Sequence, residues 1–157
     1  MVLSHARRQI LHFNVTASPK ASWIAQQLRE AFPFTAPPKY LLRDRDILYG
    51  LEFQRVTQAL GLEEVRIAPR SPWQSPYVER FIGSLRRECL DQVLVLSQGH
   101  LHRLVQSYLA YYHDWRTHLS LNKDAPEPRR VQSSGEGKIV AFPEVGGLHH
   151  RYERQAA

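Results

Sequence analysis

The chain has 157 residues, of which 43% are hydrophobic and 10% aromatic, and it carries a formal net charge of +6. This much apolar sequence predicts one core and one domain, and the excess of Lys and Arg favours a polyanionic partner. The single cysteine, Cys89, excludes a disulfide framework and a cysteine-based metal site, and the apolar runs are too short to cross a membrane.

The first predicted elements are two strands of a hairpin. Residues 1–3 resemble the end of an apolar strand, and we expect its beginning to be missing. After a basic turn at Arg7 and Arg8, the apolar residues Leu11, Phe13 and Val15 alternate with polar ones. This period of two predicts a strand with Leu11, Phe13 and Val15 on its buried face.

A helix is predicted to begin at Ser18-Pro19, because a hydroxyl caps free amides and proline has no amide to leave unpaired. Its predicted buried side consists of Trp23, Ile24, Gln27, Leu28 and Ala31.

The next predicted strand is the apolar run at residues 39–42, which ends at the acidic residues Asp44 and Asp46. A carboxylate at the end of a strand is well placed for a functional site. A helix over residues 50–60 follows, closed by Gly61, and Val65 and Ile67 predict another strand.

Ser75-Pro76 repeats the helix-start signal, and the helix is expected to run to about Cys89. Its predicted buried stripe is Val78, Phe81, Ile82, Leu85 and Cys89. Glu79 lies off that stripe, on the side of Gly83, Arg86 and Arg87. A carboxylate in a first helical turn often only complements the helix dipole. A metal-bound phosphate backbone lying across this side is the functional interpretation.

The remaining elements are a long helix and a short tail. Ser97 is expected to cap the helix, whose apolar face holds Leu101, Leu104, Val105, Tyr108, Leu109 and Tyr112; we interpret this face as core and not as a base-stacking platform. Residues 139–142 and 148–152 could pair across Gly146-Gly147. Because adjacent strand residues point to opposite faces, His149 and His150 do not predict a metal pair.

Three segments together resemble the integrase catalytic core of bacterial insertion-sequence transposases, which are relatives of retroviral integrases. The segments are residues 44–49 (Asp-Arg-Asp-Ile-Leu-Tyr), residues 71–80 from Ser71 to Arg80, and residues 111–118 followed by Ala125-Pro126. The resemblance covers about residues 1–131. It implies a ribonuclease-H-like fold, an α/β arrangement with a mixed sheet flanked by helices and the first strand missing. Residues 132–157 would form a basic tail, with a possible small β-hairpin.

In that family two Asp and one Glu bind two Mg²⁺ ions, and Mn²⁺ is the usual substitute. The spacing matches Asp44 to the second Asp and Glu79 to the Glu. Asp46 is a rival for Asp44; we prefer Asp44 because Tyr49 follows it as the family's aromatic residue does. The family's first Asp has no counterpart, since no acidic residue precedes Glu30.

The resemblance therefore implies DNA integration or transposition by metal-dependent strand cleavage and transfer. With Asp44 and Glu79 alone we expect this chain to be inactive or nearly so. The alternative is a non-catalytic DNA-binding or dimerising remnant. The expected partners are DNA and further copies of the chain, in the bacterial cytoplasm at the nucleoid and without a membrane. The candidate DNA contacts are Arg80, Arg86, Arg87, Trp73, Gln74 and Arg116, the last with a structural or backbone-contact role.

Overall fold

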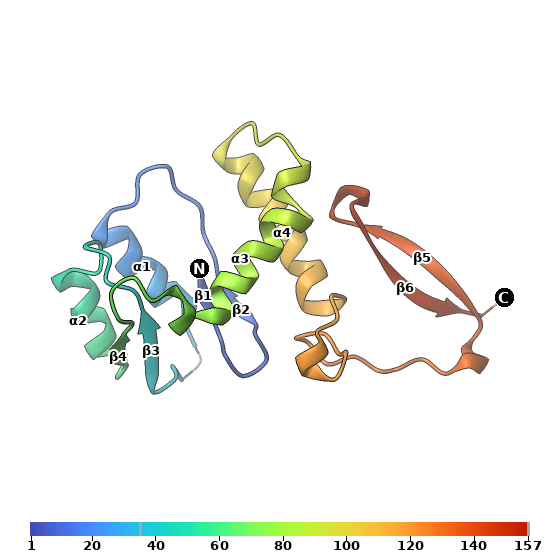
Figure 1. Cartoon of the computed structure of the whole chain (residues 1–157), viewed down its shortest axis with the longest axis horizontal. Helices are drawn as coiled ribbons and strands as arrows, with labels where there is room; N and C mark the ends of the chain where they lie inside the picture. Colours follow the sequence, from blue (N-terminus) through green and yellow to red (C-terminus); the bar gives the residue numbers. More distant parts are fainter. Residues whose placement is uncertain (35, 157) are drawn as a thin grey trace. The chain divides into compact units, whose positions relative to one another are not determined.

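The structure is a computed structural model that describes residues 1–34 and 36–156. The chain forms two compact units (Figure 1), so the prediction of one core is wrong. The first comprises residues 1–3 and 10–82, and the second comprises residues 4–9 and 83 onward. In the described part of the chain, no helix is both long and apolar enough to span a bilayer. The last residue of the predicted tail lies outside the described residues.

The first unit begins with the predicted hairpin. Strand β1 (Val2–Leu3) pairs antiparallel with β2 (Ile10–His12). The predicted buried face is wrong, because Ile10 is buried and Leu11 is 44% exposed. In a strand, a shift of one residue moves every side chain to the other face.

The core of the first unit lies between α1 (Ala21–Ala31) and α2 (Leu51–Ala59). Helix α1 begins after Lys20, which makes no side-chain cap, so the predicted start at Ser18-Pro19 is two residues early. The predicted closure of α2 is confirmed, since Gly61 has a φ of +70°. The buried core residues are Ala25, Leu28, Ala31, Phe32, Phe53, Val56 and Leu62.

Strands β3 (Tyr40–Arg43) and β4 (Glu63–Arg66) form a parallel pair. Buried Arg43 joins the two strands through Glu64, with Nη2 to Oε2 at 2.6 Å, and Thr57 of α2 donates to the other Glu64 oxygen at 2.7 Å. The described strands of the whole chain form three separate two-stranded sheets rather than one mixed sheet.

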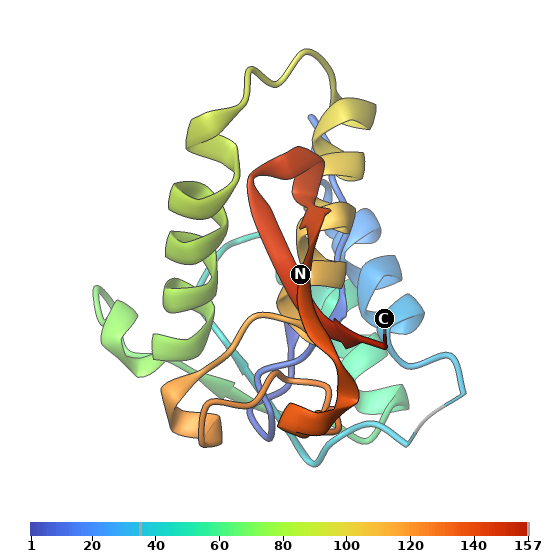
Figure 2. The same cartoon turned by 90° about the vertical axis from the view of Figure 1, so that its right-hand side faces the viewer.

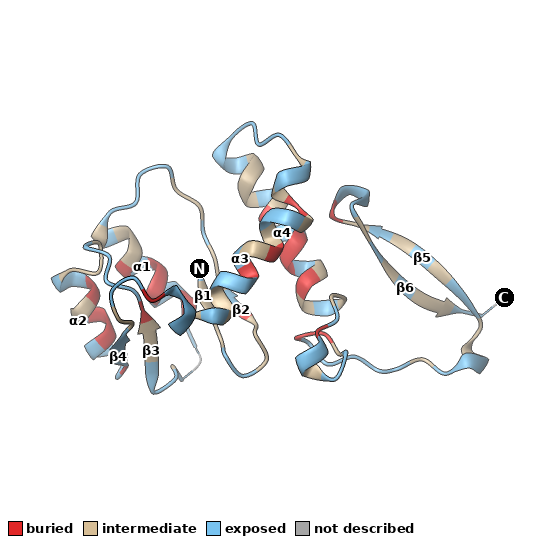
Figure 3. Ribbon diagram, viewed as in Figure 1, coloured by how far each residue is buried: buried red, intermediate tan, exposed pale blue. Residues whose placement is uncertain are grey.

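Helix α3 (Pro76–Glu88) follows a single 3-10 turn at Pro72–Gln74, as predicted from Ser75-Pro76. Helix α3 has both buried and exposed residues (Figure 3). Its buried stripe differs from the prediction, because Ile82 is 40% exposed whereas Ser84 is buried together with Phe81. Residues 81, 84 and 88 follow the helical period as well as the predicted set does. The division between the two units falls within α3.

The second unit contains α4 (Gln98–Asp114), and the predicted cap is confirmed by a hydrogen bond from the His100 amide to Ser97 Oγ at 3.1 Å. Tyr108 and Tyr112 are buried, which confirms their interpretation as core residues. Short 3-10 turns lie at Leu90–Gln92, Leu119–Leu121, Ser134–Glu136 and Val145–Gly147.

The predicted tail hairpin is confirmed. Strand β5 (Lys138–Glu144) pairs antiparallel with β6 (His149–Gln155) along their full length (Figure 2). His149 and His150 do point to opposite faces. His150 is exposed, whereas the ring of His149 stacks on Tyr111 with centroids 4.4 Å apart.

Candidate functional site

The acidic residues Asp44 and Asp46 lie in the turn that directly follows β3. Both are exposed. The Asp46 amide donates to Asp44 Oδ1 at 3.1 Å, and the Leu48 amide donates to Asp46 Oδ1 at 2.9 Å. Each carboxylate therefore shapes the turn with one oxygen, and the hydrogen bonds alone do not distinguish Asp44 from Asp46 as a metal ligand.

The position of Asp44 is fixed by bonds that its two neighbours make to Ile67. The Ile67 amide donates to the Arg43 carbonyl at 3.0 Å, and Arg45 Nε donates to the Ile67 carbonyl at 2.9 Å. Ile67 directly follows β4. The acidic turn is thus held beside the carboxyl end of the neighbouring parallel strand.

The segment that leads into α3 is fastened at the same place. The amide of Ala68 donates to Oε1 of Gln74 at 2.7 Å. The 3-10 turn then passes into α3 through Ser75, whose carbonyl accepts from the Glu79 amide at 3.2 Å. One strand end, at Ile67 and Ala68, therefore binds both the segment of Asp44 and the segment of Glu79.

The chemistry of this edge suits a hard cation. Asp44, Asp46 and Glu79 are exposed carboxylates, and Mg²⁺ binds through one or two carboxylates together with water and phosphate oxygens. Across residues 1–34 and 36–156, however, no three His, Cys, Asp or Glu side chains are close enough to hold a metal by themselves. The type of side chain therefore suits such an ion, but the described residues would need further ligands to hold one.

The candidate DNA contacts in α3 and in the turn before it are exposed. Trp73 is 70% exposed, and Arg80, Arg86 and Arg87 are also exposed. A Cβ added at Gly83 would lie 3.0 Å from Nη1 of Arg87, so the Arg87 side chain lies across Gly83. Because Gly83 has no side chain, the Arg87 guanidinium can lie flat along the helix. The helical period predicts Glu79 on this same side of α3.

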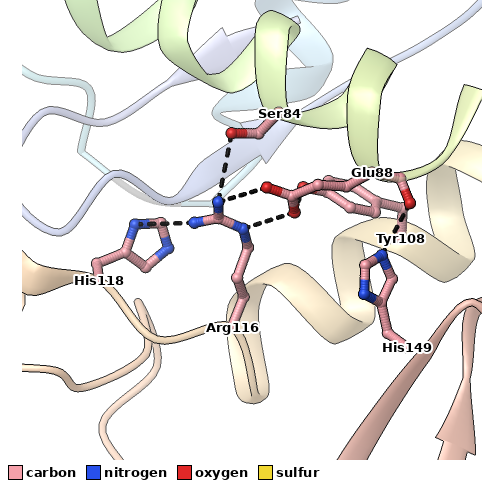
Figure 4. Close-up of polar contacts among 6 residues, drawn as sticks. All are labelled: Ser84, Glu88, Tyr108, Arg116, His118 and His149. Atoms are coloured by element: carbon pink, nitrogen blue, oxygen red, sulfur yellow. Dashed lines mark hydrogen bonds and ion pairs between the residues drawn. The ribbon is translucent and has the colours of Figure 1, made fainter. Parts of the chain in front are cut away.

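Arg116, the remaining candidate DNA contact, lies in an ion-pair network of the second unit (Figure 4). Its Nη2 is 2.6 Å from Oε1 of Glu88 and its Nε is 2.8 Å from Oε2. Ser84 accepts from Nη2 at 3.4 Å, and His118 Nδ1 lies 3.5 Å from Nη1. This arrangement supports the structural role expected for Arg116.

Tyr108 and His149 complete the network around Glu88. The Tyr108 hydroxyl donates to Oε2 at 2.8 Å, and His149 Nε2 lies 2.8 Å from the Glu88 carbonyl oxygen. Burial alone would raise the pKa of Glu88, but hydrogen bonds from Arg116 and Tyr108 and the Arg116 charge outweigh it, and the pKa is lowered. Burial and the bond to Glu88 raise the pKa of Tyr108.

Sequence reasoning did not single out Glu88, although a signal was present. Glu88 follows Phe81 and Ser84 at helical spacing, so an acidic residue lies on the buried stripe of α3. A half-buried carboxylate requires a cationic partner. Arg116 belonged to the third recognised segment and was the available cation.

Comparison with known proteins gives one family match: residues 60–126 match the family described as an integrase core domain. The chain is 25% identical over 149 residues to the "Insertion element IS476 uncharacterized 39.2 kDa protein" of Xanthomonas euvesicatoria, covering 94% of this chain and 43% of that protein. It is 28% identical over 109 residues to the "Insertion element IS407 uncharacterized 31.7 kDa protein" of Burkholderia multivorans, covering 66% and 38%. The chain spans about two fifths of the length of these curated relatives.

Among solved structures, a chain of the simian T-cell lymphotropic virus intasome in complex with PP2A regulatory subunit B56 gamma has a similar fold. The TM-score is 0.54 at 18% identity, over 87% of this chain and 53% of that chain. Residues 60–126 are therefore similar to an integrase core domain, and the chain as a whole is similar to proteins of insertion elements.

Proposed function

We propose that this integrase-core-like chain acts in DNA transposition, as a ribonuclease-H-like core that cuts and joins DNA strands with a divalent metal only when a further ligand completes its metal site. The observation that supports this best is the double attachment at the end of β4, where Ile67 holds the Asp44 turn and Ala68 holds the segment leading to Glu79. Functional carboxylates commonly gather at the carboxyl ends of parallel strands.

Asp44 and Glu79 are the proposed ligands for Mg²⁺ or Mn²⁺. Such an ion would polarise a phosphodiester and stabilise the oxygens that attack and leave, first water and then a 3′-hydroxyl as nucleophile. Asp44 is preferred over Asp46 because it is the first residue after β3. Asp46 would then have a structural role, because its carboxylate accepts from the Leu48 amide and so stabilises the turn.

The proposed partners are element-end and target DNA, and further copies of the chain, at the bacterial nucleoid. Arg80, Arg86 and Arg87 would contact phosphates from α3, and exposed Trp73 would contact DNA from the loop before it. Gln74 and Arg116 would position other segments rather than contact DNA directly. The Gln74 side chain already accepts from the Ala68 amide, and Arg116 already forms an ion pair with Glu88.

The test is Mn²⁺ binding by electron paramagnetic resonance, with Asp44→Asn, Asp46→Asn and Glu79→Gln. Loss of affinity in the Asp44 and Glu79 variants, with Asp46→Asn close to wild type, supports the assignment. Loss only in Asp46→Asn would transfer the role to Asp46. Equal Mn²⁺ affinity in the wild type and all three variants would refute the proposed metal site.

The catalytic part of the proposal has its own test with element-end DNA. The chain has no acidic residue before Glu30, so it supplies only two of the three expected carboxylates, and we propose that it is inactive or nearly so alone. Strand joining by the purified chain, abolished by Glu79→Gln, would refute that inactivity.

A second candidate function is a non-catalytic DNA-binding or dimerising remnant. It is favoured by the net charge of +6 and by the absence, over the described residues, of a three-ligand metal cluster. A steep loss of DNA affinity with salt, without Mn²⁺ binding, would support it. No DNA binding at low salt would exclude it.

A further inference from the structure

A groove in the second unit lies between the segment after α4 and the β5–β6 hairpin. Its lining does not include Asp44, Asp46 or Glu79. It encloses about 380 Å³, which is within the range of about 300–1,000 Å³ typical of small-molecule sites. One wall is formed by residues 122–124 and 129–132, and the other by Ile139 of β5 and residues 152–154 of β6.

The charge left in this groove is positive. Its two acidic residues are paired with cations that do not line it: Asp124 with Arg7 at 2.9 Å, and Glu153 with Arg151 at 3.1 Å. Among the described residues, no carboxylate side chain forms an ion pair with the lining residue Lys123.

Arg129 is a second lining cation, and it is oriented by an aromatic ring. Its guanidinium lies 5.2 Å from the centroid of Trp115, which also receives Arg151 at 5.3 Å. No carboxylate side chain in the described ranges forms an ion pair with Arg129. Cation–π contact holds a charge in place without neutralising it, so Lys123 and Arg129 present two uncompensated charges to a ligand.

The opposite wall offers an exposed aromatic ring. Tyr152 is 60% exposed and Ile139 is 62% exposed, and both lie on the outward face of the hairpin. The ladder is fixed at this point, since Gln132 donates to the Arg154 carbonyl at 3.3 Å and accepts from its amide at 2.6 Å. The ring is therefore presented by a braced strand.

We propose that this groove binds a single DNA strand, with phosphates at Lys123 and Arg129 and a base against Tyr152. A cationic wall facing an exposed ring is the arrangement by which proteins hold single strands without reading their sequence. The proposal rests on the proposed function in transposition, and it assigns to the groove a DNA strand that is separated from its complement during that reaction. Among the cations of this part of the chain, Arg151 therefore has a structural role, whereas Lys123 and Arg129 bind the strand.

The test is fluorescence anisotropy of the full chain with labelled oligothymidylate, in EDTA and on a Glu79→Gln background. The double variant Lys123→Asn, Arg129→Gln should bind at least tenfold more weakly, with a log-affinity against log-salt slope shallower by about 1.4. The control Arg103→Gln, Lys138→Gln removes two exposed charges outside the groove and should bind as the parent protein does. Equal losses in the two double variants would overturn the proposal.

Two further variants keep the test decisive. Lys123 has a φ of 64°, which Asn tolerates, so Lys123→Asn alone tests the charge if the Arg129 variant fails to fold. Tyr152→Thr should lower affinity about tenfold without changing the salt slope, and Tyr152→Phe should retain affinity.

Duplex DNA of the same length is the competing ligand. Binding of duplex as tightly as single strand, with the same losses, would overturn the assignment to a single strand. Since neither Glu79 nor a metal is used, groove binding can fail while the metal assignment stands, and the reverse also holds.

Discussion

Glu88 and Arg116 form a two-point ion pair, with Oε1 to Nη2 at 2.6 Å and Oε2 to Nε at 2.8 Å, across 28 positions of sequence. The pair joins the last residue of α3 to the segment just after α4. About a quarter of each side chain is exposed. Glu88 also receives the hydroxyl of Tyr108, so one carboxylate satisfies two partners.

Removing this carboxylate should destabilise the second unit. Glu88→Ala leaves the half-buried Arg116 and the Tyr108 hydroxyl without their acceptor, which we expect to cost about 1–3 kcal/mol of unfolding free energy. Urea denaturation measures it. Glu79→Gln, which changes an exposed carboxylate on the same helix, is the control. A Glu88→Ala midpoint equal to that control would contradict the structural role of the pair.

The same residue predicts a dependence of stability on acid. The pKa of Glu88 is lowered from 4.5, because bonds and charge from Arg116 and Tyr108 outweigh burial, so the folded protein binds this proton more weakly than the unfolded chain. Its contribution to the unfolding free energy is therefore complete above pH 4.5 and is lost as the pH falls through the lowered pKa. The unfolding free energy of Glu88→Gln should fall less steeply below pH 4.5 than that of the wild type.

Glu64 provides a second, independent reading of this effect. Its pKa is also lowered, against the opposing effect of burial, by hydrogen bonds from Thr57 and Arg43. The unfolding free energy of the first unit should therefore also fall less steeply with decreasing pH in Glu64→Gln than in the wild type. Identical slopes in the wild type and both variants would show that neither pair survives in solution as described.

Gln74 should influence metal binding without being a ligand. Its side chain accepts the Ala68 amide at 2.7 Å and so holds the segment that leads to Glu79. Gln74→Ala should weaken Mn²⁺ binding several-fold, because a looser segment pays more entropy when Glu79 is fixed by the metal. Trp73→Ala, at the adjacent exposed position, should leave Mn²⁺ affinity unchanged. Equal effects of the two variants would argue against positioning by Gln74.

Local signals in the sequence predicted most of the helices. Ser97 caps α4, Gly61 closes α2 and Ser75-Pro76 opens α3, since each depends on backbone groups within a few residues. The buried face of β2 was predicted wrongly because a three-residue strand provides too little alternation to fix which face is covered. The burial of Ile82 was predicted wrongly because two neighbouring stripes on α3 have the same period.

The assignment of Asp44 and Glu79 as metal ligands stays a prediction, and the contacts that hold their segments were not predicted. Asp44 and Glu79 were chosen from spacing and from resemblance to integrase cores. The bonds from Ile67 to the residues beside Asp44, and the bond from Ala68 to Gln74, involve polar groups with no distinctive pattern in the sequence. Long-range pairs such as Glu88 with Arg116 depend on how helices pack, and a single sequence does not record that packing.

Gly137 offers the sharpest test of the tail hairpin. It has a φ of +114°, and a Cβ there would lie 2.0 Å from the Gln155 carbonyl oxygen at the end of β6. Gly137→Ala must therefore push the two strand ends apart in addition to straining its own backbone, and the strain alone costs about 1–3 kcal/mol. Hydrogen exchange should show lost amide protection in β5 and β6.

Gly135→Ala is the matched control, because a Cβ at Gly135 meets nothing within 4 Å and its backbone is not left-handed. Arg154 donates to the Gly137 carbonyl at 3.0 Å, so opening the hairpin at this point also displaces one wall of the groove. Gly137→Ala should therefore weaken binding of oligothymidylate while Gly135→Ala does not. Unchanged amide protection in Gly137→Ala would mean that the strands do not close at this residue, and the braced wall beside Tyr152 would then lose its support.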